Sequence, residues 1–164
     1  MIRLIVIGAL LALGVVMAYI RYTPSSPADW HLDPRAVPKP KSPNHWLVRP
    51  VGGDARPPFW AIDAVTLAQA FDRAALALPR TDRLAGDVGA GHMTYIRRTP
   101  WMGFPDFMSV RVHAAEGGAS VAIFARSRFG HSDLGYNRAW VDAVLARLEV
   151  ELGALPAPDG QGGG

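Results

Sequence analysis

The N-terminal end of the chain carries the feature that most constrains its fold, an unbroken apolar run from Leu4 to Ile20. A helix of these 17 residues is roughly 26 Å long, close to the roughly 30 Å hydrocarbon core of a bilayer. Arg3 precedes the run, and Arg21 and Tyr22 follow it, which is typical of a segment that ends at a membrane interface. The run predicts a membrane contact through residues 4–20, so the rest of the chain must build its own core.

Three interpretations of this segment compete. An uncleaved anchor is favoured, because the run is longer than the usual apolar core of a signal peptide. A signal peptide is the alternative, with Val16-Met17-Ala18 as its small-residue cleavage site. A buried helix of a soluble protein fits poorly with the N-terminal position of the run and with the proline- and serine-rich stretch that follows. In the first two interpretations we expect residues 23 onward to be exported.

Composition narrows the classes of function. The chain has no cysteine, which excludes disulfides, thiolate chemistry and cysteine-bound metals. The formal net charge is +3, and the 15 arginines and 2 lysines are scattered rather than clustered, so we expect no nucleic-acid surface. The sequence contains neither a phosphate-binding glycine loop nor a close histidine pair, and we expect no cofactor and no metal.

The chain divides into four segments. Residues 1–22 are the anchor or signal segment, 23–58 a proline-rich extended linker, 59–153 a single α+β domain, and 154–164 a disordered glycine- and proline-rich tail. Nine prolines in the linker remove backbone donors and disfavour helix. Trp30 and Trp46 are aromatic anchors that disordered linkers lack, so we expect this segment to wrap the domain in extended form.

The hydrophobic pattern of the domain predicts an antiparallel sheet of three or four strands with two helices packed on one face. Apolar residues at helical spacing predict one helix that begins after Asp63 and ends at Pro79, and a second over Arg138–Leu152. Alternating residues predict a strand over Phe107–Ala114. The run Ala119–Ala125 is apolar on both faces and predicts a central strand.

Polar residues concentrate between this central strand and the last helix, in the stretch ARSRFGHSDLGYNR over residues 125–138. Backbone donors are free at such a strand-to-helix junction, and sites are often built there. Arg126 and Arg128 alternate from a strand end and share a face, and guanidinium groups suit a phosphate or carboxylate. The junction therefore predicts a site for an anionic small molecule or lipid head group. The candidate ligand-binding residues are Arg126, Ser127, Arg128, Ser132, Asp133, Asn137 and Arg138.

The same residues also have structural and catalytic interpretations. In the structural one, Ser132 or Asp133 caps the helix, Asn137 bonds to its own loop, and an arginine pairs with Asp133 or Asp106. In the catalytic one, a hydrolase uses Ser132, His131 and Asp133, although adjacent positions rarely aim at a common atom. We name no catalytic residue and favour a binding protein over an enzyme.

An apolar loop, Trp101–Pro105, lies between two expected strands. One interpretation makes it a core plug or a cover for a sheet edge. The other makes it a lip that touches lipid or a partner protein. A docking lip would suit a structural or assembly factor that binds another envelope protein.

The junction also carries a family resemblance. FARSRFGHSDLGYNR over residues 124–138 is similar to the strand–turn–helix signature RSxSRxGxSDxGxNR of the domain of unknown function 1499 family. Weaker similarity extends to Phe104–Phe107 and to Ser42–Asn44, which resembles the family's opening Ser-Pro-Asn-Cys. The resemblance covers roughly residues 42–152. It implies a membrane-anchored or exported bacterial domain, which we expect in the inner membrane with the domain facing the periplasm, and it implies no activity.

Two positions depart from the family pattern. His45 stands where the family often has cysteine, so no cysteine role carries over. Pro105 stands where the family often has the first of two acidic residues, which leaves Asp106 as the single carboxylate. A site that depends on paired carboxylates is therefore not expected here.

Overall fold

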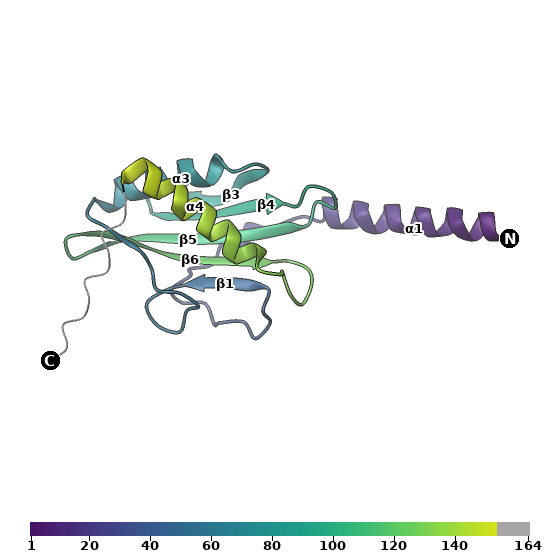
Figure 1. The fold of residues 1–164 in the computed structure, drawn as a ribbon, viewed down its shortest axis with the longest axis horizontal. Coiled ribbons are helices and arrows are strands. Elements are labelled where there is room, and N and C mark those ends of the chain that lie inside the picture. Colours follow the sequence, from purple (N-terminus) through teal and green to yellow (C-terminus); the bar gives the residue numbers. More distant parts are fainter. Residues whose placement is uncertain (154–164) are drawn as a thin grey trace.

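The computed structural model describes residues 1–153, and the predicted disordered tail lies outside the described residues. A long N-terminal helix projects from one end of an α+β domain, as the sequence predicted (Figure 1). The helices are α1 (Ile2–Tyr22), α2 (Pro27–Trp30), α3 (Ala64–Leu76) and α4 (Tyr136–Leu152). The strands are β1 (His45–Val48), β2 (Phe59–Trp60), β3 (Thr81–Asp87), β4 (His92–Arg98), β5 (Pro105–Ala115) and β6 (Gly118–Ser127).

The sheet is antiparallel, but the predicted number of strands is wrong. It has six strands in the order β1-β6-β5-β4-β3, with β2 also paired to β6. One additional strand comes from the proline-rich stretch, where His45 pairs with Arg126, and the other follows it directly, where Phe59 pairs with Ser120. The prolines flank these short strands rather than interrupt them, so the backbone donors of the ladder are kept. The short helix α2 was not predicted either.

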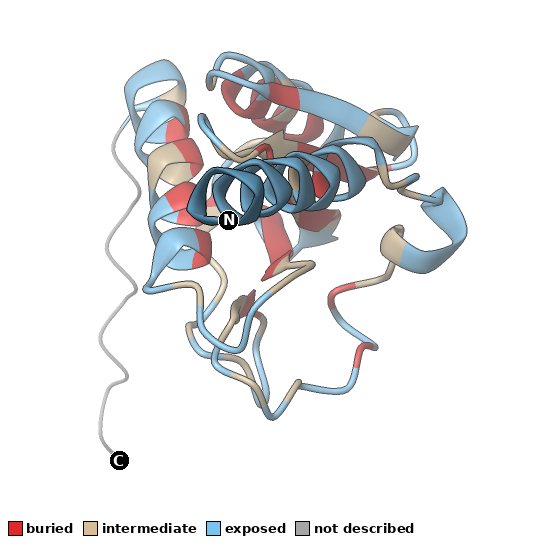
Figure 2. Ribbon diagram, turned by 90° about the vertical axis from the view of Figure 1, so that its right-hand side faces the viewer, coloured by how far each residue is buried: buried red, intermediate tan, exposed pale blue. Residues whose placement is uncertain are grey.

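One face of the sheet carries the main core. Alternation along β5 turns Met108 and Val110 toward α3 and α4, where Phe71, Trp140 and Val144 are buried against them. Figure 2 shows the buried positions of both helices facing the sheet. Helix α3 begins as predicted, because the Asp63 carboxylate accepts hydrogen bonds from two backbone N–H groups of the first turn. This core holds the strands of the central sheet in register.

The opposite face of the sheet is covered by residues 24–37, which we call the strap. Trp30 stacks on Phe107 with ring centroids 3.7 Å apart. Further along the strap, Val37 packs with Leu47 and Phe124 in a second, smaller core. Both faces of the sheet are therefore occupied, and the strap determines which groups on this face stay accessible.

Helix α1 is long and apolar enough to span a membrane. It is 21 residues long and strongly apolar, and its most apolar stretch is not buried in the domain. It leaves the domain beside the β4–β5 loop, where a Cβ atom on Gly103 would lie 3.3 Å from Nη1 of Arg21. We call this end of the domain the base; it carries the β4–β5 loop (residues 99–104) and the β6–α4 loop (residues 128–135) (Figure 1).

Candidate functional site

The predicted site residues do not converge on one point, because strand alternation divides them between the two faces of the sheet. Arg126 and Arg128 share the face that is covered by the strap, whereas Ser127 points toward α4. The prediction that the two arginines share a face is correct. Their surroundings, however, are the strap itself.

Arg126 is 8% exposed and is held by the strap. Its Nη2 atom donates to the backbone carbonyl of Trp30 over 2.8 Å. The guanidinium also lies over the Phe124 ring at 4.5 Å and the Trp30 ring at 5.1 Å. No carboxylate lies within 4.0 Å of it in residues 1–153, and burial lowers its pKa to about 10. Arg126 thus fastens the strap through a carbonyl and two aromatic rings, not through an ion pair.

Arg128 holds the beginning of the same strap. Its Nη1 atom donates to the carbonyl of Pro24 over 2.9 Å. Its guanidinium lies 5.8 Å from the Trp30 ring and 5.5 Å from the Phe129 ring. Anion binding by Arg126 and Arg128 stays a prediction, and in this arrangement each guanidinium already has a strap partner.

Asn137 joins two sequence motifs that lie far apart in the chain. It is 1% exposed, and its Nδ2 atom donates to the Asn44 carbonyl and to the Ser127 hydroxyl, each over 3.0 Å. Asn44 in turn donates from its own Nδ2 atom to the Gly130 carbonyl over 2.7 Å. We call this set the asparagine clamp. It fixes the β6–α4 loop against the residues that lead into β1.

The acidic end of the junction caps α4. The Asp133 carboxylate accepts from the backbone N–H of Asn137 over 2.7 Å and from that of Gly135 over 3.1 Å. The Ser132 hydroxyl accepts from the Leu134 N–H over 3.3 Å. In the described part of the chain, no hydrogen bond joins His131 to Ser132 or Asp133, so the hydrolase arrangement is not formed.

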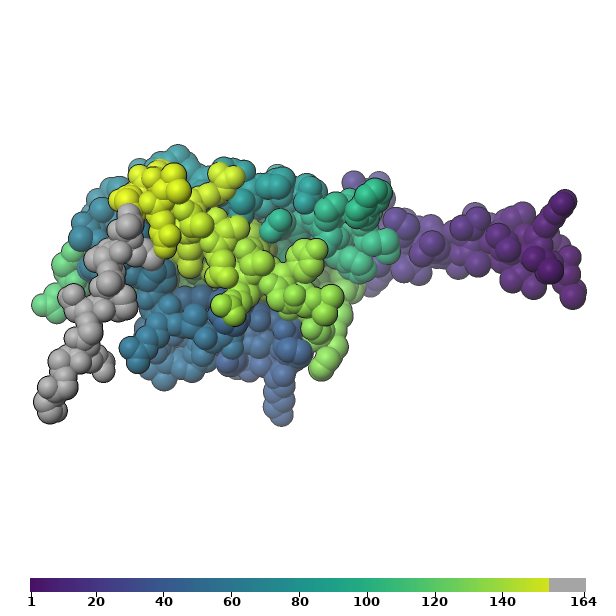
Figure 3. All heavy atoms as spheres, in the orientation of Figure 1, coloured from purple at the N-terminus to yellow at the C-terminus, as the bar shows by residue number. Residues whose placement is uncertain are grey.

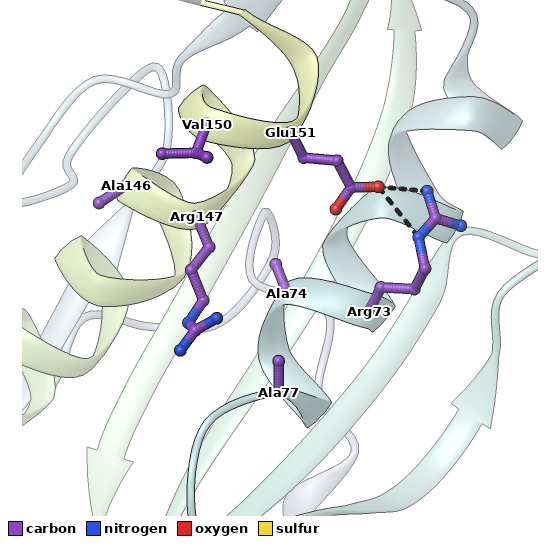
Figure 4. Close-up of a pocket in the computed structure, with 7 residues that line it drawn as sticks. All are labelled: Arg73, Ala74, Ala77, Ala146, Arg147, Val150 and Glu151. Carbon is purple, nitrogen blue, oxygen red and sulfur yellow. Dashed lines mark hydrogen bonds and ion pairs between the residues drawn. The ribbon is translucent and has the colours of Figure 1, made fainter.

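One hollow of the domain lies away from the junction, between α3 and α4. It has a volume of about 560 Å³ and an open, shallow shape, with small residues such as Ala74 and Ala146 along it (Figure 4). Arg73 and Glu151 form an ion pair across it, as the dashed lines in Figure 4 show. Small side chains at a helix crossing leave such a groove, and the ion pair uses Arg73 and Glu151 on each other, which leaves Arg147 as a single exposed charge, so we assign it no site.

A second hollow lies at the base, beside the β6–α4 loop. It has a volume of about 320 Å³, and the aromatic rings of Phe104 and Phe129 meet edge to face there at 5.9 Å. We call it the apolar pocket. Three of the predicted site residues line it together with Asp106. They are Ser127, Ser132 and Asp133.

A third hollow adjoins the apolar pocket and shares Thr99, Asp106 and Tyr136 with it. We call it the arginine pocket. Its volume is about 210 Å³, and its other lining residues are Arg80, Arg97, Arg98, Pro100 and Trp140. The three arginines come from the turn before β3 and from the end of β4. Within residues 1–153 none of them has a carboxylate oxygen within 4.0 Å.

Asp106 lies between the two pockets. Burial raises the pKa of this carboxyl, and the nearby Asp133 raises it further. A hydrogen bond from Ser127 and the charge of Arg97 act in the opposite direction. Burial likewise lowers the pKa of Arg97, and the neighbouring Arg80 lowers it further. A charge added to either pocket would therefore act strongly on the ionisation of Asp106 and Arg97.

Sequence reasoning missed the arginine pocket. Arg97 and Arg98 are adjacent at a strand end, and Arg80 follows the predicted helix, which are weak signals in a chain with 15 arginines. The remaining predicted residue, Arg138, is exposed and lies over the Trp46 ring at 4.9 Å. It lines a further hollow of about 390 Å³ together with Ser132 and Asp133. Among residues 1–153, no cluster of three metal-ligating side chains is present.

Comparison with known proteins identifies the family. A search of curated proteins finds no match. The family model described as "Protein of unknown function (DUF1499)" matches residues 36–148, about two thirds of the chain. The match includes the strap end, the asparagine clamp and both pockets of the base. This protein therefore belongs to the DUF1499 family, as the junction motif had suggested.

Proposed function

We propose that this protein is a single-pass membrane-anchored domain that binds an anionic amphiphile at its base. The phosphate or carboxylate head would lie in the arginine pocket and the apolar part in the adjoining apolar pocket. The observation that carries this proposal is a pocket lined by three arginines, none of which has a carboxylate oxygen within 4.0 Å in residues 1–153, beside a pocket with two phenylalanine rings. Because the sequence resembles a bacterial envelope domain, we place it in the inner membrane, facing the periplasm.

The arginines have donors to offer. Arg80 donates one hydrogen bond, from its Nε atom to the Arg98 carbonyl. Arg98 donates one from its Nη1 atom to the Gly103 carbonyl. A guanidinium has five N–H donors, so the others are available to a ligand. The like charges of Arg80 and Arg97 also repel each other, and an anion relieves that repulsion. This is the chemistry of phosphate and carboxylate recognition by arginine.

Asp106 makes the proposed binding depend on pH. An anion that enters the arginine pocket opposes ionisation of Asp106, whose pKa is already raised by burial. Binding would then be accompanied by proton uptake. The affinity should accordingly increase as the pH falls toward the range in which Asp106 is protonated, and an Asp106→Asn variant should lose this dependence.

Binding of soluble probes to the full chain in detergent tests the proposal. The probes are short-chain phosphatidic acid, inorganic phosphate and short-chain phosphatidylcholine. We expect saturable binding of phosphatidic acid, weaker binding of phosphate, and none of phosphatidylcholine. A charged hydrogen bond contributes about 1.5–3 kcal/mol, so Arg80→Gln and Arg98→Gln should each weaken phosphatidic acid binding about tenfold or more.

Arg147→Gln is the matched control, because Arg147 is an exposed arginine of the α3–α4 groove. It should leave the affinity unchanged. Equal affinities for phosphate and phosphatidic acid would limit the site to a free anion and remove the apolar pocket from it. Loss of binding in Arg128→Gln but not in Arg98→Gln would move the anion to the strap face and refute the assignment to the arginine pocket.

A further inference from the structure

The base of the domain presents large apolar side chains to the outside. Trp101 and Leu134 are each 89% exposed; Trp101 lies in the β4–β5 loop and Leu134 at the end of the β6–α4 loop, just before α4. The two loops are linked underneath by the edge-to-face contact of Phe104 with Phe129. A single exposed apolar residue needs no explanation. Two large apolar side chains at the same end of the domain, on two linked loops, form an apolar surface whose contact with water is unfavourable.

Leu134 is held in an unusual conformation. Its φ is +53°, in the left-handed region that leucine rarely adopts. The flanking backbone is fixed, because Asp133 caps α4 and the Leu134 N–H donates to Ser132. The loop thus holds a bulky apolar side chain outward against its own backbone preference. Such strain marks positions where an exposed side chain has a role.

The position of α1 identifies what covers this surface. The helix is 21 residues long, or about 31 Å, so its last turn reaches the edge of a hydrocarbon core of about 30 Å. That turn contains Arg21, whose side chain lies against Gly103 in the middle of the β4–β5 loop. The loop is therefore at the level of the membrane interface. Figure 3 shows α1 emerging directly beside this end of the domain.

The residue types at the base are those that bind lipid surfaces. Tryptophan is enriched at membrane interfaces, and Trp101 stands next to the point where α1 ends. Arg21 and Arg98 both lie beside Gly103 of the β4–β5 loop, where Arg98 Nη1 donates to the Gly103 carbonyl over 3.2 Å. Basic side chains around an apolar tip favour a surface that contains anionic lipid.

We propose that Trp101 and Leu134 insert into the interfacial region of the same bilayer that α1 spans, so that the base of the domain rests on the membrane. This inference concerns the loops and does not depend on a ligand in either pocket. It assigns one occupant, the lipid surface, to the apolar base.

Depth-dependent fluorescence quenching tests this inference. The full chain is reconstituted into vesicles of phosphatidylcholine with a minor share of phosphatidylglycerol, with bromine at a shallow or a deep position of the acyl chains. The other four tryptophans are buried or half-buried, so Trp101 should carry most of the quenching. We expect shallow bromine to quench more than deep bromine, and Trp101→Phe to lose most of the effect.

Two reporters placed in the Trp101→Phe background separate the base from the rest of the domain. Leu134→Trp should restore shallow quenching. Val150→Trp is the matched control, because Val150 is 88% exposed near the other end of α4, and it should restore none (Figure 1). Melting temperatures near that of the parent chain show that the variants are folded.

Several results would overturn the inference. They are unchanged quenching in Trp101→Phe, equal behaviour of the Leu134 and Val150 reporters, and failure of the chain to float with the vesicles. Blue-shifted but unquenched Trp101 emission would show instead that the base is covered by protein, either a second copy or a partner.

Discussion

Arg126 offers a sharp test of how the strap is held, because its charge is buried without a counter-ion. Burial lowers its pKa from 12.5 to about 10, which corresponds to about 3 kcal/mol of cost for the charged form. The hydrogen bond to the Trp30 carbonyl returns about 1.5–3 kcal/mol, and the two aromatic contacts about 1–2 kcal/mol. The charge therefore contributes little net stability, while the aliphatic part of the side chain contributes packing.

Two substitutions separate these contributions. Arg126→Met removes the charge and keeps most of the apolar volume, so the free energy of unfolding should change by less than about 1 kcal/mol. Arg126→Ala also removes buried methylene groups at about 0.8 kcal/mol each and leaves a cavity, so we expect a loss of about 3 kcal/mol. For a domain of this size that loss lowers the melting temperature by about 10 °C.

Thermal unfolding of the full chain in detergent, followed by near-ultraviolet circular dichroism, measures both variants. Near-ultraviolet bands report the packing of the aromatic rings, among them Trp30 stacked on Phe107. Equal destabilisation by both substitutions would show that the charge itself is required. A parental melting temperature in Arg126→Ala would refute the structural role and return Arg126 to the candidates for anion binding.

Further predictions concern the clamp and the strap. Asn137→Ala removes two hydrogen bonds from a buried position and should lower the free energy of unfolding by about 2 kcal/mol. Arg138→Ala, at the exposed neighbouring position, should lower it by less than about 0.5 kcal/mol. The same thermal assay measures both variants. Burial lowers the pKa of His31 below 6.5, with His92 and Arg111 lowering it further, so the unfolded chain binds more protons and stability should decline as the pH falls below about 6.5. His31→Gln should reduce that decline between pH 7.5 and 5. A carboxylate origin for the decline is excluded at Asp33, which has a pKa of about 2 in the folded state and titrates well below this range.

The elements that were predicted correctly are those whose own residues carry the pattern. Asp63 caps a helix with an apolar face, and residues Phe107–Ala114 alternate, so both elements could be placed from local spacing alone. The strands β1 and β2 could not, because their four and two residues are too short for a period and lie among prolines. Their pairing depends on β6, which is far away in the sequence.

The sequence predicted a single site made of seven residues, but the structure does not bring these residues together at one point. A period of two along β6 places Ser127 on the opposite face from Arg126 and Arg128, and this much could have been inferred from the sequence. What could not be inferred is the partner on each face. The strap reaches Arg126 from 96 residues away, and Asn44 reaches Asn137 from 93 residues away.

At this end of the sheet, structural residues can be told from candidate binding residues by the acceptors that their N–H donors bind. Arg126 and Asn137 are nearly fully buried, and their bonds go to carbonyls of segments that would otherwise be loose. Arg80 and Arg98 stand at the rim of a pocket, and each uses one donor on a local carbonyl. A buried polar group must be bonded within the fold, because leaving it unpaired costs about 1–3 kcal/mol, whereas a rim arginine can remain hydrated until a ligand arrives. Truncation to alanine in the first pair should therefore lower stability, and substitution in the second pair should lower affinity while leaving stability within about 0.5 kcal/mol.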